Sequence, residues 1–395
     1  MRSKIVYIGL SYSIQFLNII LNLLFMQRLS VQTLGDLAIA KVWLQAFDYS
    51  HLGSRFALDR FLPVLHQAKQ RHLYLLIALT VVITGSLLVL FVSLIAEQAN
   101  SIVLAFCLVG ISLAVGNVLK AYFRATADIV QVNNIVARLY VLPLTISVAF
   151  AAYDFDWFLW VYPFSFVSAL LYFSVPFIIQ FKFKTFSLIR IRIVFFKVLS
   201  VSKLLFVNAL IVYSTLIVDR LFVDLTLGRD ALGQYSIIMF VFASLFTVPS
   251  ILTELIFPKI VQQVVNDGKR FFWKETVFVF FTTLLIVVIS NVVMYFIVVN
   301  YTPYEKLIPL MQLASLAVLP YSFSSIIHHV LNALDKRHIL MITNASILII
   351  ACISFYFLSR GVVDLESIIL IKVFVALLNA IFLLFVLKMT VGRND

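Results

Sequence analysis

Long runs of apolar residues, separated by short polar stretches, repeat along the whole chain. A helix needs roughly 20 apolar residues to cross the hydrocarbon of a bilayer, and about twelve segments meet this requirement. The predicted spans are 5–25, 34–56, 72–95, 101–122, 133–152, 157–179, 204–225, 232–257, 276–299, 307–331, 339–357 and 367–387. The pattern therefore predicts an all-α protein that crosses a membrane many times.

Composition agrees with this prediction. Of the 395 residues, 63% are hydrophobic and only 12% are charged, whereas soluble domains have about half and a quarter. The first apolar run is too long for the core of a signal peptide, so we expect it to stay as the first span. We attribute the net charge of +12 to topology and lipid contact, and do not expect nucleic-acid binding.

The basic residues also predict an orientation. If the N-terminus is cytoplasmic, most lysines and arginines fall in inner loops, and the outer loops hold only Arg28, Arg229, Lys306 and Arg360. This distribution follows the positive-inside rule. We therefore expect both termini to be cytoplasmic.

The longest predicted connection is the cytoplasmic sequence FKFKTFSLIRIRIVFFKVLS, at residues 181–200. Basic and apolar residues alternate in it, which is typical of an amphipathic segment on an anionic leaflet. It divides the chain into an N-terminal six-helix lobe (1–181), a basic linker (182–203) and a C-terminal six-helix lobe (204–395).

The two halves share a short motif. TLGDLAIAKVWLQAF, residues 33–47, follows the first span, and ALGQYSIIMFVFASLF, residues 231–246, follows the seventh. Repeats of six spans keep one orientation, so they are related by an axis along the membrane normal. The motif favours two related lobes around a central cleft, while a chance Leu-Gly match stays open as the alternative.

Polar residues inside the spans form stripes. Those of the first span recur at helical spacing, at Ser11, Gln15, Asn18 and Asn22. Those of the second fall within roughly 80° of arc, at Lys41, Gln45, Asp48 and Arg55. A charge in mid-bilayer costs on the order of 3 kcal/mol, so we expect the stripes to face a wet cavity. The alternative is that polar groups only join helices.

Further charges lie in other spans. In the seventh, Arg220 and Asp224 are four residues apart, which predicts a structural or gating ion pair, and Asp219 is expected to face the cleft. Glu254, in the eighth span, follows Thr247 and Ser250. Arg138 and Lys372 lie near span ends, so they line the cavity or reach the interface by snorkelling.

Several chemistries lack their motifs. The chain has no Gly-rich phosphate loop, no CxxC pair and no HExxH motif, and adjacent His328 and His329 point about 100° apart on a helix. We therefore predict no enzyme activity, metal or cofactor. Cys107 and Cys352 fall inside spans and are expected to be thiols.

Two stretches resemble a known family. TLGDLAIAKVWLQAFDYSHLGSRFALDRFLP (33–63) and DRLFVDLTLGRDALGQYSIIMFVFASLFTVPSILTELIFPKI (219–260) are similar to bacterial polysaccharide-exporting flippases. These are the O-antigen type translocases of the multidrug/oligosaccharidyl-lipid/polysaccharide (MOP) superfamily. The motif "DR, short loop, LGQYS, FPKI" carries the resemblance, and the rest of the chain agrees in hydropathy.

The resemblance implies a flippase with a MATE-like fold in the bacterial inner membrane. Its substrate would be an undecaprenyl-pyrophosphate-linked oligosaccharide, an O-antigen or capsule repeat unit, moved to the periplasmic leaflet by alternating access. Coupling to H⁺ or Na⁺, contact with membrane lipids and partnership with other polysaccharide-assembly proteins are also implied.

A cationic cavity, which members of the family are described as having, suits a pyrophosphate. Its candidate residues are Lys41, Arg55, Arg138, Arg220 and Lys372. The candidates for glycan hydrogen bonding are Ser11, Gln15, Asn18 and Asn22. The candidates for gating or ion coupling are Asp48, Asp219, Asp224 and Glu254.

A multidrug antiporter and a membrane glycan polymerase or ligase are the alternatives to a flippase. A multidrug antiporter of the same superfamily would be expected to carry an acidic residue in the first span, and residues 5–25 contain none. A membrane glycan polymerase or ligase would need a large periplasmic loop with catalytic Arg or His, and the predicted outer loops are short.

Overall fold

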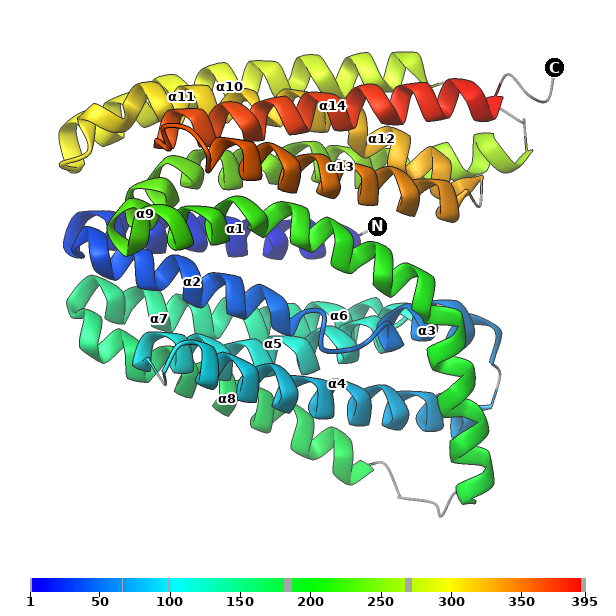
Figure 1. The fold of residues 1–395 in the computed structure, drawn as a ribbon. Helices are drawn as coiled ribbons and strands as arrows, with labels where there is room; N and C mark the ends of the chain where they lie inside the picture. Colours follow the sequence, from blue (N-terminus) through cyan, green and yellow to red (C-terminus); the bar gives the residue numbers. More distant parts are fainter. Residues whose placement is uncertain are drawn as a thin grey trace. The chain divides into compact units, whose positions relative to one another are not determined.

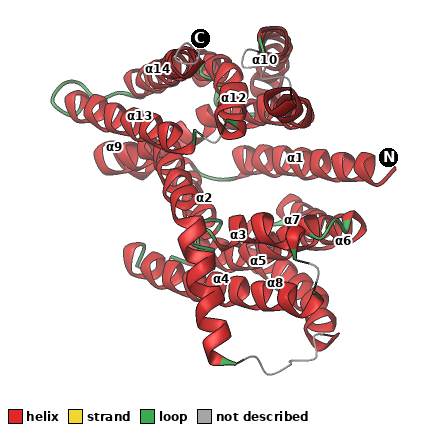
Figure 2. Cartoon of the chain, turned by 90° about the vertical axis from the view of Figure 1, so that its right-hand side faces the viewer, coloured by secondary structure: helices red, strands yellow, loops and turns green. Residues whose placement is uncertain are grey.

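The computed structural model describes residues 2–65, 67–98, 100–180, 187–266, 272–334 and 336–391, and every regular element among them is helical (Figures 1 and 2). The helices of the first half are α1 (Arg2–Arg28), α2 (Val31–Phe47), α3 (Ser54–Phe61), α4 (Ala68–Ala96), α5 (Ser101–Ala125), α6 (Ile129–Ile135), α7 (Leu142–Tyr153) and α8 (Phe155–Gln180). Those of the second half are α9 (Leu188–Asn266), α10 (Trp273–Tyr301), α11 (Ile308–Leu316), α12 (Val318–Ala333), α13 (Arg337–Leu358) and α14 (Leu365–Val391). Short 3₁₀ turns cover Leu62–Val64 and Glu305–Leu307, and a π-helical segment, Val136–Val141, joins α6 to α7.

Within the described residues, 10 helical stretches are long and apolar enough to cross a bilayer. One of them, Ser202–Phe246, has 45 residues and holds the predicted seventh span and much of the eighth, separated by Gly228 at φ 82°. The predicted second span is not one helix, because α2 ends after 17 residues at Phe47 and a turn precedes α3. The prediction of an all-α protein that crosses the membrane many times is confirmed.

The chain folds into two compact units. Unit 1 contains Met1–Phe25 and Asp36–Phe206, and unit 2 contains Met26–Gly35 and Val207–Asp395. The described part of the predicted linker, residues 187–203, belongs to unit 1, and from Leu188 it is helical as the start of α9. Residues 182–186 lie outside the described residues.

Aromatic rings fill the centre of unit 1. Phe158 of α8 is fully buried and stacks on Tyr162 at 5.0 Å, and Phe25 and Phe106 pack against the edges of this pair. Phe47, also fully buried, lies over Gly110 of α5, where an added Cβ would come within 2.6 Å of its ring. This glycine therefore lets the end of α2 pack closely on α5.

Aliphatic side chains form the core of unit 2. Buried residues of α9, α10, α12, α13 and α14 make one cluster that includes Ile260, Val279, Leu331, Leu340 and Leu383. Phe222 of α9 stacks on Phe355 of α13 with 4.9 Å between ring centroids. The part of α9 that belongs to unit 2, from Val207 on, is thereby packed on the last helices of the chain.

The two Leu-Gly motifs meet each other within unit 2. A Cβ on Gly35 would overlap the carbonyl oxygen of Arg229, and a Cβ on Gly233 would overlap the carbonyl oxygen of Val31. Each carbonyl lies four residues before the glycine of its own motif, so the two contacts are reciprocal. The shared motif therefore has a physical cause, because each backbone approaches too closely for any side chain larger than that of glycine.

Alanine at Gly233 will strongly destabilise the protein, because its Cβ overlaps a backbone carbonyl that cannot rotate away. We expect a loss of about 1–3 kcal/mol or more, measured as a lower Tm of the purified protein in detergent. Gly9, in α1, is the matched control, since nothing lies within 4 Å of a Cβ there. Gly9→Ala should leave the Tm unchanged or raise it, and an equal Tm for both variants would contradict the close contact.

Candidate functional site

A tight turn between α2 and α3 places the first group of polar side chains. Leu52 and Gly53 are both left-handed, with φ of 44° and 84°, and the Gly53 N–H donates to His51 Nδ1 at 2.8 Å. Ser202 lies within 2.5 Å of the position that a Cβ on Gly53 would take, so glycine is required by both conformation and space. The predicted continuous stripe from Lys41 to Arg55 is therefore wrong, because the helix ends before Asp48.

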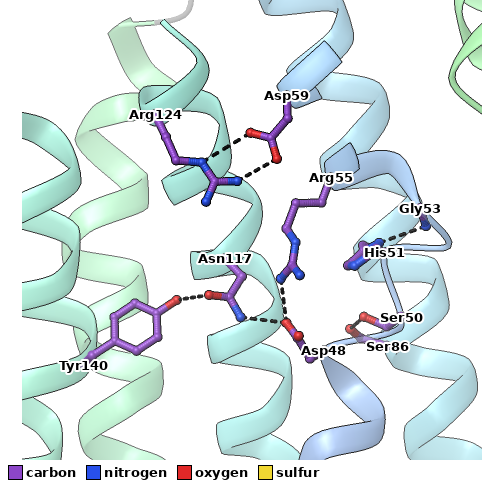
Figure 3. Close-up of polar contacts among 10 residues, drawn as sticks. All are labelled: Asp48, Ser50, His51, Gly53, Arg55, Asp59, Ser86, Asn117, Arg124 and Tyr140. Carbon is purple, nitrogen blue, oxygen red and sulfur yellow. Dashed lines mark hydrogen bonds and ion pairs between the residues drawn. The ribbon is translucent and has the colours of Figure 1, made fainter. Parts of the chain in front are cut away.

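Asp48 and Arg55 nevertheless come together across this turn. Arg55 Nη1 lies 2.9 Å from Asp48 Oδ1. Asn117 of α5 donates from Nδ2 to the same oxygen at 2.7 Å, and Tyr140 of the π-helical segment donates its hydroxyl proton to Asn117 Oδ1 at 2.7 Å. Figure 3 shows these four side chains converging from three parts of unit 1. We call them the Arg55 cluster.

The Arg55 cluster is accessible. The side chains of Arg55 and Asp48 are 24% and 40% exposed, so an anion can reach the guanidinium without disrupting the core. Gly116 leaves room for the Tyr140 hydroxyl, which lies 3.2 Å from where its Cβ would be. Tyr140 also lies in a π-helical segment, a distortion that is frequent at functional sites.

A second ion pair lies near the Arg55 cluster and links α5 to α3 (Figure 3). Arg124 of α5 binds both carboxylate oxygens of Asp59 of α3, at 2.6 Å from Nη2 and 3.3 Å from Nε. Its side chain is 57% exposed, so the pair contributes little to stability. It provides a natural comparison for Arg55.

Lys41 lies on α2 and contacts α1 rather than the Arg55 cluster. Its ammonium donates to Asn22 Oδ1 and lies 5.8 Å from the centroid of the Phe25 ring. Asn22 itself donates to the Asn18 carbonyl at 2.7 Å, and Ser11 donates to the Tyr7 carbonyl at 2.9 Å. Ser11, Gln15, Asn18 and Asn22 are all half-buried. Of the first-span stripe, Asn22 thus contacts Lys41, one of the candidates for the cationic cavity.

A second group of polar side chains is buried in unit 2. The Lys372 ammonium of α14 binds Asp219 Oδ2, and the Tyr235 hydroxyl donates to the same oxygen at 2.5 Å. The Arg220 backbone N–H donates to Asp219 Oδ1 at 2.8 Å, and Lys372 lies 5.1 Å from the centroid of the Phe242 ring. The side chains of Lys372 and Asp219 are only 13% and 3% exposed. Asp219 is therefore buried among residues of unit 2, and its position relative to a cleft stays a prediction.

The other candidate residues are Asp224, Arg220, Arg138 and Glu254. Asp224 pairs with Arg229, at 3.1 Å from Nε, instead of with Arg220, its expected i, i+4 partner. Arg220 is half-buried, and Arg138 is exposed on the π-helical segment. Glu254 lies in α9, but its side chain is outside the described ones.

Two tyrosines were missed by sequence reasoning. Tyr140 and Tyr235 each donate to a polar side chain of a predicted stripe or span. Their hydroxyls were not counted as polar positions, since tyrosine reads as an aromatic residue in a hydrophobicity pattern. Among the described residues, no group of three or more His, Cys, Asp or Glu side chains is placed to hold a metal ion.

Comparison with known proteins gives the fold. No protein-family model matches the chain, and no curated protein sequence matches it. Lipid II flippase MurJ, in an inward closed conformation, is similar with a TM-score of 0.64 and 15% identity, over 97% of this chain and 87% of that one. An inward-facing multidrug resistance MATE family transporter of the MOP superfamily has a TM-score of 0.60 and 10% identity, over 95% and 98% of the two chains.

A MATE structure in the straight conformation is also similar, with a TM-score of 0.57 and 12% identity over 99% of this chain and 96% of that one. These likenesses extend over nearly the whole chain, and at such low identity they concern the fold. Together with the apolar helices, they show a multi-pass membrane protein that shares its fold with MurJ and with MATE transporters.

Proposed function

We propose that the protein is a flippase that moves an undecaprenyl-pyrophosphate-linked oligosaccharide from the cytoplasmic to the periplasmic leaflet of a bacterial inner membrane. The observation that carries the proposal is the Arg55 cluster, in which an accessible guanidinium is paired with Asp48, and Asp48 is held by Asn117 and, through it, by Tyr140. The fold supports it, since a protein described as a lipid II flippase has the same one. In this proposal the chain transports and catalyses no covalent change.

The guanidinium of Arg55 suits a pyrophosphate. Its planar fork can bind two phosphate oxygens at once, and such charge-assisted hydrogen bonds are about twice as strong as neutral ones. In the protein without substrate, Asp48 orients the guanidinium through the 2.9 Å contact between its Oδ1 and Arg55 Nη1. A pyrophosphate carries more negative charge than one carboxylate, so it can displace Asp48, which keeps its hydrogen bond from Asn117.

The displaced carboxylate provides a route to ion coupling. Once Arg55 turns to the phosphate, Asp48 loses its cationic partner and becomes a place where H⁺ or Na⁺ can bind. Lys41, with Asn22, adds a second positive charge in unit 1 beside the amides of the first-span stripe. Those amides and hydroxyls are the groups that bind sugar hydroxyls.

The multidrug antiporter remains the second candidate, since MATE transporters share the fold. Both candidates are tested by reconstituting the purified protein in vesicles that carry the lipid-linked oligosaccharide in both leaflets. A glycan-cleaving enzyme added outside should consume about half of the substrate without the protein and nearly all with it. Protection of half of the glycan in both cases would reject the flippase, and efflux of a cationic dye would then favour the antiporter.

A further inference from the structure

The first turns of α9, residues 188–203, form a segment that runs across the ends of the other unit 1 helices, as Figures 1 and 2 both show. We call it the crosswise segment. Val194, Val198 and Ser202 recur every four residues along it and are 9%, 0% and 0% exposed. This side of the segment is therefore packed against unit 1.

The packed side contacts the turn that carries the Arg55 cluster. Ser202 lies against Gly53, and Phe206, just beyond the segment, has its ring centroid 6.5 Å from that of His51. The Lys197 ammonium lies 4.8 Å from the centroid of the Phe61 ring, at the end of α3. The crosswise segment thus supports both ends of the stretch that positions Asp48 and Arg55.

The opposite side is apolar and basic at once. Leu188, Ile189, Ile193 and Phe196 are 83%, 74%, 62% and 57% exposed, an apolar surface that usually marks an interaction site. The segment also has the exposed basic residues Arg190, Arg192 and Lys203, besides Lys197, which contacts Phe61. The sequence from 187 to 218 has no acidic residue. Long basic side chains can cover apolar groups while their charges reach outward.

We propose that the crosswise segment binds anionic phospholipid headgroups at the membrane surface. Its position across the helix ends suits a helix lying in the interfacial plane, with the apolar side chains among the acyl chains. Arg190, Arg192 and Lys203, in a segment whose sequence has no acidic residue, match the charge of an anionic leaflet. Each is worth about a fivefold change in affinity. Because Ser202 packs on Gly53, lipid binding also holds the turn of the Arg55 cluster. This last step rests on the proposed function.

The lipid contact is tested with a fluorescent reporter on the segment. Ser200, which is exposed, is replaced by cysteine and labelled with bimane in a Cys352→Ser background, while buried Cys107 stays unlabelled. The full chain is placed in phosphatidylcholine vesicles that contain a minor fraction of phosphatidylglycerol. A nitroxide near the headgroup end of the acyl chain is carried by one lipid or the other, at equal mole fraction.

Nitroxide-labelled phosphatidylglycerol should quench the bimane several times more strongly than nitroxide-labelled phosphatidylcholine. Arg190→Gln/Arg192→Gln should make the quenching by the two lipids nearly equal, because each arginine is worth about a fivefold change in affinity. The matched control Lys306→Gln/Arg360→Gln, which removes two exposed charges of unit 2, should keep it. If the two labelled lipids quench the protein that keeps Arg190 and Arg192 equally, the proposal is overturned. This comparison does not need the double variant, so it can be made even if that variant fails to fold.

A transport assay in the same vesicles tests the connection to the Arg55 cluster. Translocation of the lipid-linked oligosaccharide should slow several-fold when phosphatidylglycerol is omitted. An unchanged rate, together with preferential quenching, would overturn the connection and leave headgroup binding in place. A chain that shows preferential quenching but moves no oligosaccharide in either lipid would instead reject the proposed function.

Discussion

Arg55→Ala will stop export of the lipid-linked glycan while the protein stays folded in the membrane. The substitution removes the accessible guanidinium of the Arg55 cluster, and a hydrogen bond to a charged group is worth about 1.5–3 kcal/mol. Affinity for the pyrophosphate should therefore fall about 10–100-fold. Because Arg55 is partly exposed, the folded protein should lose little stability. The measurement is surface glycan per unit of membrane protein in complemented cells.

Arg124→Ala is the matched control for this prediction. Arg124 lies near Arg55 and also pairs with an aspartate, but its side chain is 57% exposed and its bonds to Asp59 are already bidentate. We expect glycan export to stay near normal in this variant, and Arg55→Lys to restore part of the loss. Normal export by Arg55→Ala at a normal protein level would remove Arg55 from the substrate site.

Lys372→Met will cause a large loss of stability. It leaves the carboxylate of Asp219 buried, 3% exposed, without its cationic partner. Breaking a buried ion pair by removing one side costs about 3–5 kcal/mol, a large part of the roughly 5–15 kcal/mol that stabilises a folded protein. The expected result is a sharply lower Tm and little recoverable protein.

Removing both charges should restore most of that stability. Asp219→Asn/Lys372→Met keeps the volumes of both side chains, and uncharged replacements of a buried pair are often neutral. Lys336→Met serves as a control in the same unit, since this lysine is exposed and its loss should change stability by less than about 0.5 kcal/mol. A double variant no more stable than Lys372→Met would show that the ion pair is not the cause.

The sequence predicted the helices better than the contacts between them. Apolar runs identify spans because the bilayer sets their length. The prediction of the second span as one helix was wrong, because Leu52 and Gly53 have positive φ angles and turn the chain within an otherwise apolar run. Asp48 and Arg55 still meet, but across a turn instead of along a helix face.

Pairing of charges could be predicted only where it was local, and even there it was unreliable. Helical spacing indicated Arg220 for Asp224, whereas Asp224 pairs with Arg229, which follows the non-helical Gly228. Asp219 and Lys372 were both identified as candidates, but 153 residues separate them, and no periodicity brings such distant positions together. Tyr140 and Tyr235 were missed because a hydrophobicity pattern counts tyrosine as aromatic and not as a polar position.

The central claim is that this chain moves a lipid-linked oligosaccharide across the membrane. Its most direct measurement is the leaflet in which that intermediate accumulates in cells that lack the protein. We predict accumulation on the cytoplasmic leaflet, reversed by the intact gene and not by Arg55→Ala. An intermediate that reaches the periplasmic leaflet normally, with only the polymer missing, would contradict the flippase and favour a polymerase or ligase.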